Sequence, residues 1–381
     1  MQKMIKVSRN LLLKGVHLMK KILVASMLLV LALSMMVSAA SFKIGVITGT
    51  VSQGEDEYRG AEAMIKKYPD LIIHKTYPDN FMAEQETYIS QITSLAADRN
   101  VKAIVINQAV PGTLAAIKKV KELRPDILFF VGEPHEDPAT VGALINFGIR
   151  PDDAARGVTI PTIAKSMGAK TFIHYSFPRH MAMQPLSERR DIMKQTCDKL
   201  GINFVFVTAP DPMAEGGLPA AQQFILEDVP RQVAKYGKDT AFFSTNCGMQ
   251  EPLIKAVILA KALYPEQCCP SPTHGYPGAI GLEVTNDIKG DYAKIFKAIE
   301  AKIVAAGMAG RMATWPVPGP YLLTTANVEI AKRAVEGTLD LKNDKAIQAV
   351  IEEVAGQKLA AFSRNSGNLF VYLVNSRTFG I

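Results

Sequence analysis

Tryptophan and cysteine are both scarce in this chain of 381 residues, which contains one tryptophan and four cysteines. The cysteines lie at positions 197, 247, 268 and 269, and their spacing matches neither a disulfide scaffold nor a zinc site. The vicinal pair Cys268 and Cys269 cannot easily bridge to itself without strain. Two alternatives stay open: a bridge from Cys197 or Cys247 to that pair, or buried free thiols.

Acidic residues are absent from the first 39 positions, which carry six lysines and arginines. Removing these six from the 43 basic residues leaves 37 basic against 36 acidic residues, so the formal charge falls from +7 to +1. A body so close to neutral has no electrostatic reason to bind nucleic acid or anionic lipid. With 48% hydrophobic and 21% charged residues, the chain is neither disordered nor fibrous, and its length supports two domains.

Residues 1–39 are predicted to be a leader that contains a signal peptide. Lys20 and Lys21 precede an apolar run at residues 22–36, and small residues follow at 37–41. This order is typical of secretory signal peptides, and we expect Met19 to be the natural start. An uncleaved membrane anchor is the alternative. The mature protein is therefore expected in the periplasm, or otherwise outside the cytoplasmic membrane, after cleavage near Ala40 or Ser41.

Apolar runs alternate with amphipathic helical stretches from residue 42 onward. In the first half, strands are predicted at 42–47, 71–77, 101–106, 127–131 and 144–147, with helices at 55–67, 85–97 and 111–122. A helix start is expected after the crossing at residues 150–153. Continuous apolar strands that alternate with helices indicate a parallel sheet covered on both faces.

The same rhythm restarts in the second half. Strands are predicted at 171–175, 204–207, 240–243 and 369–374, with helices at 186–200, 220–236, 252–263, 287–306, 328–335 and 345–354. No Gly/Ser-rich linker separates the halves. We therefore predict an α/β fold of two doubly wound parallel-sheet lobes joined by a multi-crossing hinge. Lobe 1 is expected to comprise residues 41–148 and about 276–316, and lobe 2 residues 149–275 and about 317–381.

Enzyme signatures are missing from the sequence. Residues 49–54 have the glycine spacing of a phosphate loop, but three acids follow where that loop needs Lys and Ser or Thr. The motifs G-x-G-x-x-G, H-E-x-x-H and G-x-S-x-G are absent, and the histidines are scattered. A two-thiol racemase would need a cysteine in each lobe, whereas all four lie beyond residue 196. We expect no catalytic site, no metal and no cofactor.

Polar side chains recur where the predicted strands end. Ligands of open parallel sheets bind beyond the carboxyl ends of the strands, so these side chains are predicted to bind a small polar organic molecule. The predicted ligand-binding residues are Thr50, Ser52, Gln53, Asn107, Gln108 and Glu133 from one lobe, and Tyr175, Ser176, Arg179 and Asn246 from the other, with His274 near a crossing.

Each of these residues also has a structural interpretation. Ser52, Gln53 and Asn246 could cap helices. The pair at residues 107–108 could belong to a turn, and Arg179 could pair with a surface acid.

Three stretches resemble the type I periplasmic-binding-protein family. They are residues 42–47 at the opening strand, residues 152–173 with 187–190 and 199–202, and residues 240–246 followed by 252–256. The resemblance covers about residues 42–335. Residues 287–310 and 317–337 are faintly similar to the basic-membrane-protein branch, whose members bind nucleosides and related compounds. In sugar-binding members an aspartate often follows the asparagine at position 246, whereas Cys247 follows it here. The chain is most similar to an uncharacterised group of secreted binding-protein-like proteins.

The resemblance implies an extracytoplasmic solute-binding protein that serves an ABC importer and closes about its hinge on a ligand. The expected partners are a small-molecule ligand and a membrane permease, and we expect a monomer. Arg179 and the ring-bearing residues favour an aromatic or carboxylate-bearing ligand. Two alternatives remain: a sensing subunit for a membrane receptor, and a secreted enzyme that uses Glu133, His135 or His174 as acid and base.

Overall fold

The computed structural model describes residues 42–285 and 287–381 of the chain. The predicted signal peptide lies outside the described residues. Among the described helices, none combines the length and the apolar character that a membrane crossing requires. The described chain from Lys43 to Ile381 contains a seven-stranded, a three-stranded and a two-stranded sheet.

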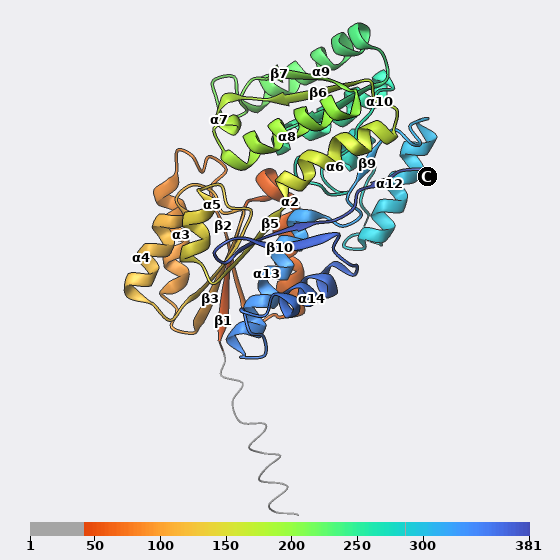
Figure 1. Cartoon of the computed structure of the whole chain (residues 1–381). Helices are drawn as coiled ribbons and strands as arrows, with labels where there is room; N and C mark the ends of the chain where they lie inside the picture. Colours follow the sequence, from red (N-terminus) through yellow and green to blue (C-terminus); the bar gives the residue numbers. More distant parts are fainter. Residues whose placement is uncertain (1–41, 286) are drawn as a thin grey trace, which may run out of the picture. The chain divides into compact units, whose positions relative to one another are not determined.

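The seven-stranded sheet has the order β10-β11-β5-β4-β3-β1-β2 and is parallel except for β10, which runs antiparallel to β11 (Figure 1). Its inner strands are almost wholly apolar and buried, as expected for a sheet with both faces covered. The strands are β1 (Lys43–Thr48), β2 (Ile72–Thr76), β3 (Val101–Asn107), β4 (Leu128–Gly132), β5 (Phe147–Pro151), β10 (Ala361–Ser366) and β11 (Leu369–Leu373).

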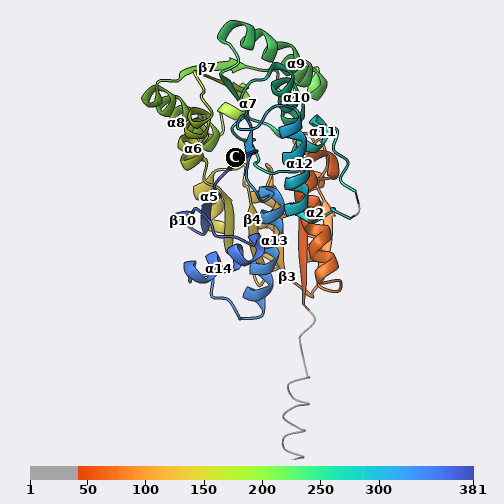
Figure 2. The ribbon, with the colours of Figure 1, turned by 90° about the vertical axis from the view of Figure 1, so that its right-hand side faces the viewer.

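Helices cover both faces of this sheet. On one face α3 (Gln85–Ala96), α4 (Thr113–Leu123) and α5 (Pro138–Leu144) pack apolar residues against the strands. On the other face lie α13 (Gly319–Val335), α2 (Val51–Lys67) and α14 (Asp344–Ala355), with α13 beside α2 (Figure 2). We call this sheet and its six helices the first lobe.

The second lobe is built on the sheet β7-β6-β8, whose strands are all parallel. Its strands are β6 (Thr171–Ser176), β7 (Asn203–Thr208) and β8 (Thr240–Ser244). Its helices are α6 (Asp153–Ser166), α7 (Pro178–Met181), α8 (Gln184–Leu200), α9 (Gly217–Tyr236), η1 (Cys247–Met249), α10 (Gln250–Ala260), α11 (Tyr276–Ala279) and α12 (Tyr292–Ala305). α6 and α8 cover one face of the sheet, and α9, α10 and α12 contribute to the core on the other. The short strands β9 (Ala313–Thr314) and β12 (Arg377–Thr378) pair with each other.

The chain passes between the lobes three times: between β5 and α6, between β9 and α13, and between β11 and β12. The predicted α/β fold with two parallel-sheet lobes and several crossings is thus confirmed. The predicted division of the C-terminal third is wrong. Residues 276–316 include α12, whose Ile295 and Ile299 lie in the second-lobe core. Residues 317–381 supply α13, α14 and β11 to the first lobe, because the apolar β11 pairs with β5.

Candidate ligand cavity between the lobes

A cavity of about 410 Å³ lies at the carboxyl ends of strands from both sheets. Its wall contains residues that follow β1, β3 and β4 in the first lobe, and residues that follow β6 and β8 in the second. The lining residues are Gln53, Phe81, Gln108, Glu133, Pro134, His135, Glu136, Asp137, Pro138, Arg150, Arg179, His180, Ala182, Met183, Gln184, Pro185, Leu186, Met213, Asn246, Cys247, Cys268 and Cys269. This position is where open parallel sheets bind ligands.

Five of the predicted ligand-binding residues line this cavity. They are Gln53, Gln108, Glu133, Arg179 and Asn246. Each directly follows a strand or stands on the loop or the first turn of the helix after it, and this position is what the sequence predicted. Because the two lobes contribute to one wall, a molecule in the cavity would contact both.

The other predicted residues have partners elsewhere. Thr50 and Ser52 both donate hydrogen bonds to the Asp79 carboxylate near the surface. Buried Asn107 donates through Nδ2 to Thr324 Oγ1 at 2.7 Å, which joins β3 to α13. These contacts are structural, and the cavity lining omits all three predicted residues.

The same holds for the remaining predicted residues of the second lobe. Tyr175 lies in the second-lobe core and donates to Asp228 Oδ2 at 2.8 Å. Ser176 Oγ is 2.6 Å from Thr245 Oγ1. His274 Nδ1 is 2.8 Å from the carbonyl oxygen of Cys269, so it supports the loop behind the cavity wall.

Glu133 is the unusual group of the first-lobe wall. It follows β4 directly and has a φ of 46°, in the left-handed region that non-glycine residues rarely adopt. Burial raises the pKa of its carboxyl to about 7, and Arg150, whose Nη2 lies 3.9 Å from Oε1, offsets only part of that effect. A carboxyl with this environment gains free energy from a hydrogen-bond donor on a ligand.

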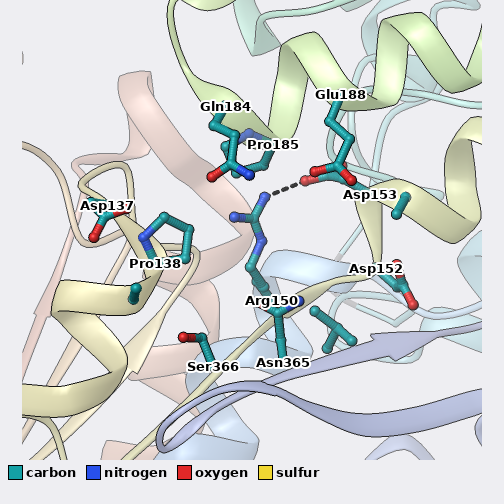
Figure 3. Close-up of a pocket in the computed structure, with 13 residues that line it drawn as sticks. Asp137, Pro138, Arg150, Asp152, Asp153, Gln184, Pro185, Glu188, Asn365 and Ser366 are labelled. Atoms are coloured by element: carbon teal, nitrogen blue, oxygen red, sulfur yellow. Dashed lines mark hydrogen bonds and ion pairs between the residues drawn. The ribbon is translucent and has the colours of Figure 1, made fainter.

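Arg150 lines both this cavity and a neighbouring one of about 270 Å³. Figure 3 shows its side chain reaching toward Asp153, with Pro138 to its left and Pro185 above it. Asp153 also accepts hydrogen bonds from Arg156 and Arg189. The first chain crossing, between β5 and α6, is therefore held by a buried network of charges.

Two imidazoles in the wall are neutral at pH 7. Burial, helped by the charges of Arg179 and Arg150, lowers the pKa of His135 to about 4, and His135 Nε2 is 3.2 Å from Gln108 Oε1. Burial and then Arg179 lower the pKa of His180 to about 3. Each ring therefore carries one donor and one acceptor nitrogen, of which His135 Nε2 already contacts Gln108, and neither ring supplies a positive charge.

Arg179 carries a charge that is already paired. Its Nε and Nη2 donate to the two carboxylate oxygens of Asp211, each at 2.8 Å, and its guanidinium lies 5.1 Å from the ring centre of Phe177. A ligand carboxylate would have to compete with Asp211 for this guanidinium. The expectation that Arg179 selects an anionic ligand therefore loses its main support.

Several lining residues were not predicted from the sequence. Phe81, Met183, Leu186 and Met213 provide apolar surface, and their positions on loops and helix starts gave no local signal. The three cysteines at positions 247, 268 and 269 also line the cavity. The position of Cys247, directly after Asn246 at a strand end, could have indicated this. Across residues 42–285 and 287–381, no cluster of three or more His, Cys, Asp or Glu residues could hold a metal ion.

Two solved structures have an architecture similar to that of this chain. A structure from Clostridium difficile 630, described as a candidate transcriptional regulator, is 29% identical with a TM-score of 0.75, covering 89% of this chain and 99% of that one. An ABC transporter periplasmic solute-binding protein from Actinobacillus succinogenes 130z, solved with D-allose, has a TM-score of 0.53 at 14% identity, covering 88% of this chain and 96% of that one. The predicted type I periplasmic-binding-protein fold is thus confirmed.

Sequence comparison defines the family. An uncharacterized protein of Treponema pallidum (strain Nichols) is 34% identical over 219 residues, which are 58% of this chain and 99% of that protein. The sequence model of the family described as "Protein of unknown function (DUF3798)" matches residues 42–313. The chain therefore belongs to the DUF3798 family and has the fold of the type I periplasmic binding proteins.

Proposed function

We propose that this protein is an extracytoplasmic solute-binding protein that captures a small polar organic molecule and delivers it to an ABC importer. The observation that carries the proposal is the cavity of about 410 Å³ whose wall is shared by the two lobes. A molecule that contacts both walls favours the closed arrangement of the lobes, and the closed form is the one that docks on a permease. The fold shared with the D-allose-binding protein supports this mechanism.

The charges of the wall favour a ligand that brings hydrogen-bond donors. Glu133 has acceptor capacity to spare, whereas Arg150 and Arg179 are engaged by Asp153 and Asp211. Hydroxyl or amino groups therefore suit this wall better than a carboxylate does. The apolar side chains opposite would contact the carbon skeleton of the same molecule.

Substitution of Glu133 tests this assignment. Calorimetric titration with a panel of neutral polyols, D-allose among them, and small amines should find a ligand that binds one molecule per chain. Glu133→Gln should then weaken binding about 10-fold to 100-fold, because it replaces one acceptor oxygen of the carboxylate with an amide that donates. Glu188→Gln is the matched control, since Glu188 lines the neighbouring cavity. Equal affinities of both variants would remove Glu133 from the site.

A ligand-responsive regulator is the second candidate function, favoured by the relative from Clostridium difficile. In that role closure on the ligand would be read by a receptor or by another protein instead of a permease. Cell fractionation shows whether the protein is exported, as an importer subunit must be. It does not distinguish import from sensing by an exported protein. Cross-linking of the exported protein to a permease in the presence of ligand supports import, and cross-linking to a receptor supports sensing. Chemical turnover of the bound molecule would support the third alternative, a secreted enzyme.

A further inference from the structure

Two of the cavity thiols contact each other. Cys247 Sγ lies 3.3 Å from Cys269 Sγ, and both cysteines are half-buried in the cavity wall. The neighbouring Cys268 has Arg189 Nη2 3.6 Å from its sulfur, and its thiol also interacts with that of Cys269. Cys197 is fully buried in the core between α8 and the second-lobe sheet. A bridge between the vicinal residues Cys268 and Cys269 would be strained, so the geometry favours Cys247 and Cys269 among the four free thiols.

The pair joins two segments that shape the cavity. Cys247 begins η1, directly after β8. Cys269 lies on the loop of residues 265–275, and this loop is attached to the first lobe: Thr273 Oγ1 donates to Asp56 Oδ1 on α2 at 2.5 Å, and the N–H of Gly319 donates to the carbonyl of Pro270 at 2.9 Å. A covalent link between the two cysteines would fix a second-lobe strand end to this loop.

We propose that Cys247 and Cys269 are a redox pair that forms a disulfide in the wall of the ligand cavity. The inference rests on the proposed function for its compartment, because disulfides persist outside the cytoplasm. A disulfide bond is about 2 Å long, so the sulfur atoms need to approach by roughly 1 Å. Cys268 stays a free thiol beside Arg189.

Thiol–disulfide exchange with a low-molecular-weight disulfide, such as oxidised glutathione, forms the link. The thiolate of one cysteine attacks the small disulfide, giving a mixed disulfide and releasing one small thiolate. The second cysteine, as thiolate, attacks the protein sulfur of the mixed disulfide and releases the other small thiolate. The two cysteines lose two electrons and two protons in total, and the small disulfide becomes two thiols.

The exchange is expected to be slow at neutral pH. Contact with the Cys247 thiol, together with burial, raises the pKa of Cys269 well above its ordinary value. Only the thiolate reacts, so the reaction should be run at about pH 8.5 and given time.

Peptide mapping of the purified native protein tests the proposal without any ligand. The protein is incubated with oxidised or reduced glutathione, quenched with acid, alkylated with N-ethylmaleimide in denaturant and digested. Oxidation should yield one linked peptide pair, Cys247 to Cys269, with Cys197 and Cys268 alkylated. The oxidised protein should also have a melting temperature about 4 °C higher, because the link lowers the conformational entropy of the unfolded chain.

Serine variants sharpen the result. Cys268→Ser should keep the link and the shift in melting temperature, whereas Cys269→Ser should lose both. Four alkylated cysteines after oxidation, or a link that includes Cys268, would overturn the proposal, and the wild-type map alone decides this if a variant fails to fold. If the link forms but the protein is found to bind no ligand, only the proposed function is contradicted. A ligand bound by a protein whose Cys247 and Cys269 stay free contradicts only this inference.

Discussion

Two carboxyl groups share Arg150, and their environments are opposite. Asp153 is buried at the crossing between the lobes and accepts hydrogen bonds from three guanidiniums, those of Arg150, Arg156 and Arg189. Burial alone would raise its pKa, but the three arginines outweigh this and hold the pKa below its usual value. Glu133 lies in the cavity wall, where Arg150 is 3.9 Å away and burial dominates, so its pKa rises to about 7.

This comparison distinguishes Asp153, whose charge stabilises the fold, from Glu133, whose carboxyl we propose binds the ligand. A buried carboxylate surrounded by its counterions stabilises the fold only as long as every partner remains. A carboxyl whose burial is not compensated costs stability and gains it back when a ligand supplies a donor. Arg150 connects the two, so the group that we propose contacts the ligand is one residue away from the charge network of the crossing.

Removing the charge of Asp153 should have the largest effect on stability. Asp153→Asn removes the carboxylate that three buried guanidiniums share, of which only Arg156 keeps a close second one, Glu266, and should cost about 3–5 kcal/mol of unfolding free energy. Asp152→Asn is the matched control: Asp152 caps α6, and asparagine caps equally well, so the cost should stay within about 0.5 kcal/mol. Urea unfolding measures both. Equal losses in the two variants would mean that the network is not structural.

The pH dependence of the unfolding free energy should distinguish the raised pKa of Glu133 from the lowered pKa of Asp153. The pKa of Glu133 rises from 4.5 to about 7 on folding, so the contribution of this carboxyl to stability falls as pH rises from about 4.5 to 7. Glu133→Gln should remove this contribution, worth about 2–3 kcal/mol, whereas Glu57, whose burial also raises its pKa to about 7, keeps its own in both proteins. The pKa of Asp153 is lowered, so its contribution is lost only as pH falls below its ordinary value, in wild type and variant alike. A difference in unfolding free energy between wild type and Glu133→Gln that is the same at pH 4.5 and at pH 7 would contradict the assignment.

Predicted ligand-binding residues that do not line the cavity should have the smallest effect on ligand affinity. Thr50 and Ser52 donate to Asp79 near the surface, so alanine at either position should change ligand affinity less than about threefold. Calorimetric titration beside the Glu133→Gln variant measures this. A loss of affinity in Ser52→Ala as large as that in Glu133→Gln would mean that the binding site includes Ser52 and is not confined to the cavity wall.

Most of the fold could be predicted because its strands are continuous apolar runs. The incorrect predictions of strands and lobes have identifiable causes. Asp137 caps α5 and Pro138 begins it, so Leu144 ends a helix, and the predicted strand 144–147 becomes β5 three residues later. β10 is largely exposed and polar, with no apolar run to mark it. The lobe to which α12 or β11 belongs depends on long-range packing, which no local pattern records.

The candidate site was only partly predictable. Strand ends correctly pointed to Gln108 and Glu133, because the polar residue there follows the last buried residue of the strand. The rule failed at Tyr175 and Ser176, which are still within β6 and are buried by neighbouring helices. The apolar side chains of the cavity wall come from segments distant in sequence, so only the folded chain brings them together.

Native mass spectrometry of the exported protein, purified without denaturation, tests the central claim that the cavity between the lobes holds a small molecule. Ala182 lines that cavity, and Ala139 lines the neighbouring one. We predict one small molecule bound per chain in the wild type and in Ala139→Trp, and none in Ala182→Trp, whose indole would fill the space. Equal occupancy in Ala182→Trp, or no bound molecule in the wild type, would contradict the account.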